Sequence, residues 1–153
     1  MQLVSRRRPE LAAGATRKTP TASVARAVGM SDAEWHILIS LRPNLLLEGN
    51  QSVTHRLLRV LEPLLVKPLV CWRGTPHVSL RHDHRGSLLL LDVATMDAEQ
   101  QARVFDWLSQ AHGHVQVVST SAQPLFALVE REVFRADLYY RLNVLRFDIL
   151  STH

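Results

Sequence analysis

The sequence contains little cysteine and no long apolar run. Cys71 is the single cysteine among 153 residues, so no disulfide can form within the chain. This excludes the disulfide framework that is typical of small secreted domains. No apolar run approaches the roughly 20 residues that a membrane-spanning helix needs, and no apolar stretch follows the N-terminal arginines, as a secretory signal would require. We expect a cytoplasmic protein with no membrane partner.

Positive charge is concentrated at the N-terminus. Residues 1–26 carry six basic side chains against Glu10 alone, whereas the rest of the chain has 12 basic and 13 acidic residues. The first 26 residues are rich in Ala, Thr, Ser and Pro without a sustained period, which predicts a disordered basic arm. Residues 27–153 are then one folded domain. The arm is either a solvated leader or a contact for nucleic acid or an acidic partner.

Helical and strand patterns alternate along the domain. Ser31 and Glu34 stand at capping-box spacing before an apolar-periodic run, as do Asp97 and Gln100. We predict helices over residues 31–41, 52–65, 97–113, 124–130 and 134–143, and strands over 44–49, 68–72, 87–93, 115–120 and 144–150. The strands are apolar throughout, which indicates an α/β fold with a parallel sheet flanked by helices. Such sheets bind ligands at the carboxyl ends of their strands.

The loop after the first strand has the frame of a phosphate loop. A phosphate loop reads G-x-x-x-x-G-K-[ST], and here Gly49 stands at its first glycine. Thr54, His55 and Arg56 replace the second glycine, the lysine and the hydroxyl residue. Threonine resists the dihedrals that glycine permits, and histidine carries less positive charge than lysine near neutral pH. An ordinary strand–helix turn is the alternative.

Asp92 ends the four-leucine strand, at the position of a magnesium-binding aspartate in nucleotide hydrolases. In such hydrolases a second acidic residue usually follows this aspartate and activates the attacking water. Here the next residue is Val93, whose side chain cannot accept or donate a proton. As an alternative, Asp92 is a capping or turn residue.

The chain resembles the central ATPase domain of bacterial sigma-54-dependent transcriptional activators, which are AAA+ proteins with a P-loop NTPase core. The similarity lies in "GSLLLLDVATMDAEQQARVFDWL" and in "VQVVSTSAQPLFALVEREVFRADLYYRLNVLRFDIL". The family string "FREDLYYRLNV" is matched almost letter for letter by "FRADLYYRLNV". The resemblance covers about residues 44–150 and is strongest at its C-terminal end.

The resemblance implies a domain that binds ATP and Mg²⁺ in a ring and remodels sigma-54 RNA polymerase. Gly49, Thr54, His55, Arg56 and Asp92 then fall on nucleotide-binding positions, with Asp92 as the magnesium ligand.

Arg135 and Arg141 fall on the paired arginine fingers that reach a neighbouring subunit's nucleotide. In the alternative reading, Asp137 and Arg141 pair at i, i+4. On one continuous helix, side chains six residues apart would diverge by about 120°.

The sequence departs from the family at the positions that serve ATP binding, ATP hydrolysis and contact with sigma-54. The phosphate loop and the acidic pair are altered, and Ala122 replaces the sensor asparagine. Only "RGTPHVSLRHDHRG" stands where the family carries the GAFTGA loop that contacts sigma-54, so direct contact with sigma-54 is doubtful. The sequence stops before the position of the family's helical lid, so we expect a reduced core without it.

Three functions remain open. The first is a regulatory or interaction module in transcription control with impaired or absent ATP hydrolysis, whose partners are related activators or transcription machinery. The second is a weak nucleotide-binding ATPase with a non-standard phosphate loop. The third is nucleic-acid binding through the basic arm.

The histidine-rich patches do not have the ligand pattern of a zinc site. They are His77, His82 and His84 with Asp83 and the nearby Cys71, and His112 with His114. We expect solvated histidines on a short surface loop and at a helix end.

Overall fold

The computed structural model describes residues 26, 29–75, 80–81, 83–111 and 115–148. Every structural statement below concerns these residues. Except for Arg26, the predicted basic arm lies outside them. Within this part of the chain, no helix is both long enough and apolar enough to cross a membrane.

Five parallel strands form one sheet in the order β2-β3-β4-β1-β5. The strands are β1 (Leu45–Glu48), β2 (Leu69–Trp72), β3 (Ser87–Leu90), β4 (Gln116–Ser121) and β5 (Leu145–Asp148). Residues of β1 and β4 are all buried, as expected for central strands of a sheet covered on both faces. The predicted parallel sheet is confirmed.

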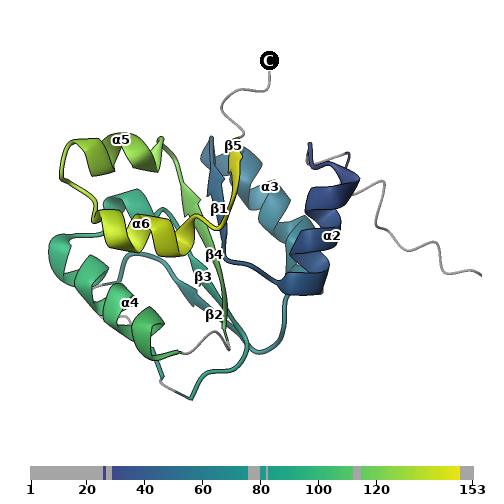
Figure 1. Cartoon of the computed structure of the whole chain (residues 1–153), viewed down its shortest axis with the longest axis horizontal. Helices are drawn as coiled ribbons and strands as arrows, with labels where there is room; N and C mark the ends of the chain where they lie inside the picture. The colour runs from purple at the N-terminus through teal and green to yellow at the C-terminus, as the bar shows by residue number, and fades with distance from the viewer. Residues whose placement is uncertain (1–25, 27–28, 76–79, 82, 112–114, 149–153) are drawn as a thin grey trace, which may run out of the picture.

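Helices cover both faces of the sheet. They are α2 (Asp32–Leu41), α3 (Gln51–Leu61), α4 (Ala98–Gln110), α5 (Leu125–Glu130) and α6 (Ala136–Leu142), with short 3-10 helices η1 (Glu62–Leu64) and η2 (Val93–Thr95). Figure 1 shows α2 and α3 on one side of the sheet and α4, α5 and α6 on the other. Two separate apolar clusters, one on each side, hold these helices to the strands.

The two predicted capping boxes are confirmed, whereas the helix predicted from residue 134 starts at Ala136. Ser31 caps α2 and Asp97 caps α4, each in a reciprocal capping box with the residue three positions on. Two other expectations were wrong. The strand predicted over residues 87–93 ends at Leu90, because Asp92 adopts a left-handed conformation with φ 53° and starts η2. Pro63 lies in η1, so α3 ends at Leu61 instead of continuing to 65.

Candidate functional site

The carboxyl ends of β1, β3 and β4 lie at one edge of the sheet because the strands are parallel. Gly49 follows β1 and Asp92 follows β3, so the predicted phosphate loop and the predicted magnesium ligand share this edge. A hollow of about 210 Å³ opens beside them. It is lined by Gln51, His55, Arg73, Gly74, Leu91, Asp92 and Thr95. A smaller hollow of about 50 Å³ shares Gln51, His55, Leu91 and Asp92 with it.

The first turn of α3 is closed by its own side chains. Oδ1 of Asn50 accepts hydrogen bonds from the N–H of Ser52 at 2.8 Å and from the Ser52 hydroxyl at 2.9 Å. The N–H of Gly49 donates to the carbonyl of Ser121 at 2.9 Å. Two backbone N–H groups that a phosphate loop would direct at a ligand are therefore already hydrogen-bonded within the chain.

The residues at the altered motif positions belong to α3. Thr54 is buried, and its hydroxyl donates to the carbonyl of Gln51 at 3.1 Å. Its position is therefore an ordinary position inside a helix. His55 is half-buried and lines both hollows. Arg56 is exposed and does not belong to the lining of either hollow.

Asp92, which follows β3, is held by hydrogen bonds to the end of β4. Its N–H donates to Oγ1 of Thr120 in β4 at 2.8 Å, and its Oδ1 accepts a hydrogen bond from the N–H of Ala122 at 3.3 Å. At the position of the family's sensor asparagine, the backbone of Ala122 thus contacts this carboxylate. Val93 is completely buried and has no acid or base to offer. Within the described part of the chain, no group of three possible metal ligands gathers around Asp92.

Sequence reasoning missed Arg73 and Glu48. Arg73 directly follows β2 and brings a guanidinium to the hollow that contains His55 and Asp92. Its place after a strand, at the ligand-binding edge, was a signal that could have found it. Glu48 ends β1 and is buried at 2% exposure, and its Oε1 accepts a hydrogen bond from the N–H of Leu125 at 2.7 Å. This carboxylate thus links β1 to the start of α5.

Arg135 and Arg141 lie away from the lining of the hollow and converge on α4. The guanidinium carbon of Arg135 is 4.6 Å from the centre of the Phe105 ring, and that of Arg141 is 5.1 Å from it. Asp137 pairs with Arg135 instead of Arg141, through Oδ1 at 3.0 Å and Oδ2 at 2.7 Å. The Asp137–Arg141 pair considered from the sequence does not form.

This ion pair shifts both ionisation equilibria. The hydrogen bond from Arg135 is the main cause of a lowered pKa at Asp137, and the same bond raises the pKa of Arg135. The side chains remain 38% and 47% exposed, so the pair is a surface ion pair.

The histidine patches give no metal site in the described residues. His77, His82, His112 and His114 lie outside these residues. His84 is within hydrogen-bond distance of the Ser87 carbonyl at 3.2 Å, and Asp83 pairs with Arg81.

Comparisons with known proteins agree with the topology. The model of the sigma-54 interaction domain family matches residues 55–151. The HTH-type transcriptional regulatory protein TyrR of Enterobacter agglomerans is 33% identical over 75 residues, which are 42% of this chain and 14% of TyrR. TyrR of Haemophilus influenzae is 32% identical over 77 residues, or 43% of this chain and 24% of that protein. The chain thus spans less than a quarter of the length of these relatives.

A similar fold occurs in solved structures of NtrX from Brucella abortus. The NtrX structure in complex with ATP has a TM-score of 0.61 and 18% identity, over 82% of this chain and 35% of that one. The structure in complex with ADP has a TM-score of 0.58 and 20% identity, over 75% and 35% of the two chains. The chain belongs to the sigma-54 interaction domain family, and its fold is the parallel α/β sheet flanked by helices that the sequence predicted.

Proposed function

We propose that this domain acts as a regulatory or interaction module in transcription control and hydrolyses ATP poorly or not at all. The observation that carries this proposal is the closed first turn of α3, where Asn50 accepts hydrogen bonds from both the N–H and the hydroxyl of Ser52. A triphosphate has to compete with these contacts for the donors that would bind it.

The loss of charge at the same loop supports the proposal. The position of the phosphate-loop lysine holds His55, and the hydroxyl residue that would assist Mg²⁺ is replaced by the exposed Arg56. Phosphoryl transfer depends on positioned cations that stabilise the developing charge on the transferred group. Asp92 by itself supplies one carboxylate for a metal, and the buried Val93 cannot activate water.

The preserved fold explains what such a domain would still do. Apolar clusters pack on both faces of the sheet, so the fold itself is maintained. The surface of α6 that carries Arg141 is exposed to solvent. A partner can recognise that surface without any chemistry at the nucleotide site. Related activators of the same family, or the transcription machinery that they contact, are the partners we propose.

Steady-state phosphate release from ATP and Mg²⁺ tests this proposal. We expect the full chain to release phosphate no faster than its Asp92→Ala variant, because the altered phosphate loop should not hold ATP for hydrolysis in either protein. Asp92→Asn is the matched control, since its side-chain oxygen can still accept the hydrogen bond from Ala122. A rate that exceeds both variants would overturn the proposal.

A second function, a weak nucleotide-binding ATPase with a non-standard phosphate loop, is favoured by the hollow of about 210 Å³. Arg73 and His55 offer it donors for phosphate, and Asp92 offers it a metal ligand. Fluorescent ATP with Mg²⁺ separates the two functions. Binding tighter than about 10 μM, which corresponds to about −7 kcal/mol, and its loss in Asp92→Ala would favour this second function.

The third function, nucleic-acid binding, depends on residues 1–26, and nearly all of these lie outside the described part of the chain. It predicts binding that weakens steeply with salt and disappears when the arm is removed.

A further inference from the structure

The solvent-exposed side of α3 carries two arginines and no acid. The helix (Gln51–Leu61) contains no Asp or Glu, and Arg56 and Arg59 lie one turn apart on its exposed side. Because side chains at i and i+3 are neighbours on a helix surface, the two guanidinium groups belong to one patch. The opposite side of the helix, with Leu57 and Leu61, is buried in the apolar cluster beneath it. We call Arg56 and Arg59 the α3 patch.

The charge of the α3 patch is not neutralised within the described part of the chain. No carboxylate of these residues lies within ion-pair distance of Arg56 or Arg59. Glu62 lies one turn after Arg59, but its carboxylate pairs with Lys67 at 3.8 Å. Arg56 makes one long hydrogen bond, from its Nε to the carbonyl of Ser52 at 3.5 Å. Both arginines therefore remain available to an anionic partner.

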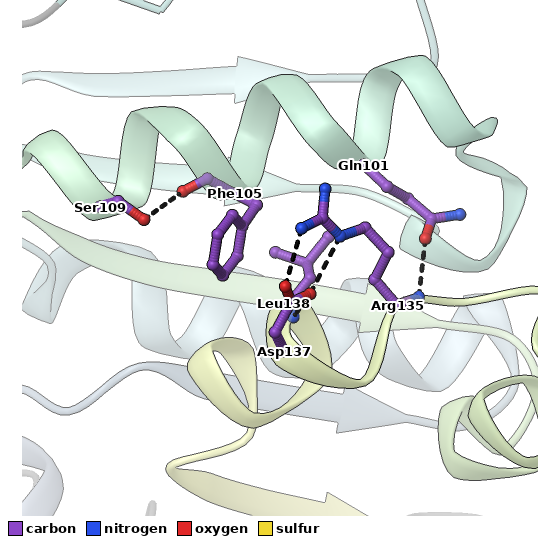
Figure 2. Close-up of polar contacts among 6 residues, drawn as sticks. All are labelled: Gln101, Phe105, Ser109, Arg135, Asp137 and Leu138. Carbon is purple, nitrogen blue, oxygen red and sulfur yellow. Dashed lines mark hydrogen bonds and ion pairs between the residues drawn. The ribbon is translucent and has the colours of Figure 1, made fainter.

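Arginines of α4 and α6, on the other side of the sheet, are engaged by their own neighbours. Arg103 pairs with Glu99, and Arg135 pairs with Asp137, as Figure 2 shows for the second pair. Arg141 lies beside an aromatic ring of α4. The α3 patch differs from these arginines because neither an acid nor a ring accompanies it.

The predicted basic arm is joined to the domain on the side of the sheet that α3 covers. Residues 1–26 carry six basic side chains against one acid, and the chain continues from them into α2. Figure 1 shows α2 and α3 on the same side of the sheet, and both helices pack in one apolar cluster. The arm is thus tethered on the side of the molecule that presents the α3 patch.

We propose that the α3 patch binds the phosphate backbone of duplex DNA together with the basic arm. A guanidinium keeps its charge and matches the geometry of a phosphate group. Duplex DNA carries one negative charge per roughly 1.7 Å of its axis, so it can meet two neighbouring arginines and the arm at once. This inference rests on the third function, nucleic-acid binding through the arm, and extends the binding surface to the folded domain.

Three observations favour duplex DNA over other anionic partners. The sequence of α3 has no Phe, Tyr or Trp on which the unpaired bases of a single strand could stack. Its apolar side is buried in the domain, so it cannot enter a membrane surface as a basic amphipathic helix does. The proposed role in transcription control would also bring the domain next to DNA.

Salt-dependent binding of a short labelled DNA duplex to the full chain tests the α3 patch. The double substitution Arg56→Gln and Arg59→Gln should weaken binding and reduce the slope of log K against log salt by about two, because two phosphate contacts are lost. Lysine at both positions keeps the charge and should keep the slope. A slope for the glutamine variant equal to that of the wild type would overturn the proposal.

A matched control removes the same amount of charge from the other side of the sheet. Arg103 lies in α4 and Arg131 follows α5, and replacing both by Gln should leave the slope unchanged. An equal loss of slope in this control would show that net charge, and not the α3 patch, governs binding. All variants should melt at the wild-type temperature, since the substitutions lie on the surface.

Replacing Arg6, Arg7 and Arg8 by Gln separates this inference from the third function. If this arm variant loses binding and the α3 variant binds like the wild type, the third function holds and the inference fails. If the α3 variant loses binding and the arm variant does not, the inference holds and the role of the arm fails. A wild-type chain that does not bind the duplex would overturn both.

Competition with poly-L-glutamate tests the choice of partner. At an equal concentration of negative charge, we expect this polymer to displace the labelled duplex less well than unlabelled duplex does, because its carboxylates lack the fixed, dense spacing of DNA phosphates. Equal displacement would assign the α3 patch to acidic proteins and overturn the choice of DNA. Single-stranded DNA that binds as tightly as the duplex would overturn the choice of a duplex.

Discussion

The hydroxyl of Thr120 accepts a hydrogen bond of 2.8 Å from the backbone N–H of Asp92. Thr120 lies in β4 and Asp92 follows β3, so this contact joins the ends of two neighbouring strands at the candidate site. It also stabilises the left-handed backbone of Asp92, which a non-glycine residue rarely adopts. The placement of the carboxylate therefore depends on a hydroxyl 28 residues away.

Replacing Thr120 by Val should destabilise the domain by about 1 to 3 kcal/mol, because the N–H of Asp92 loses its acceptor at a partly buried site. Urea unfolding followed by circular dichroism measures the change. Thr120→Ser keeps the hydroxyl and should recover most of the stability. Equal stability of the Val and Ser variants would show that this hydrogen bond does not hold Asp92.

Replacing Asn50 by Ala should cost about 1 kcal/mol of stability, the usual loss when a helix N-cap side chain is removed. Asn50→Ser supplies another capping oxygen and should change the stability little. The free energies of unfolding of the three proteins in urea check this. An alanine variant as stable as the wild type would mean that the observed cap does not close the first turn of α3.

The lowered pKa of Asp137 predicts a pH-dependent contribution to stability. Ionised Asp137 stabilises the native state above its ordinary value of 3.8, and this stabilisation disappears as the pH falls through the lowered pKa. Both partners are more than a third exposed, so we expect less than about 1 kcal/mol near neutral pH.

Unfolding of wild type and Asp137→Asn between pH 7 and pH 2 measures this contribution, with Arg135→Gln as the background control. The difference between wild type and Asp137→Asn should be greatest near neutral pH and close to zero at the acid end. It should largely vanish in the Arg135→Gln background. The same pH profile in both backgrounds would assign the effect to another group.

Local patterns predicted most of the fold. The capping boxes at Ser31 and Asp97 depend on side chains three residues apart, and the apolar strands depend on runs of four to six residues, so both are visible in a single stretch of sequence. The exposure of Ile37 and Leu41 was not predicted. Periodicity alone does not show how wide a face of α2 the sheet and α3 can cover.

The site was predicted less completely because its contacts are long-range. Gly49 and Asp92 follow strands, and parallel pairing brings those strand ends to one edge, which sequence reasoning can foresee. The stacking of Arg135 and Arg141 on Phe105 joins α4 to α6 across at least 30 residues of chain. The spacing of the two arginines in the sequence does not reveal that both contact the Phe105 ring of α4.

The central claim is that the phosphate loop of this chain no longer binds a triphosphate. Thermal unfolding of the protein in the presence of ATP and Mg²⁺ tests it most directly. A ligand with a Kd of about 10 μM would add about 2.7 kcal/mol at about 1 mM, which raises the melting temperature by roughly 5 to 10 °C. We predict a shift for the wild-type chain that is no larger than that of Asp92→Ala. A rise of several degrees that Asp92→Ala abolishes would contradict the claim.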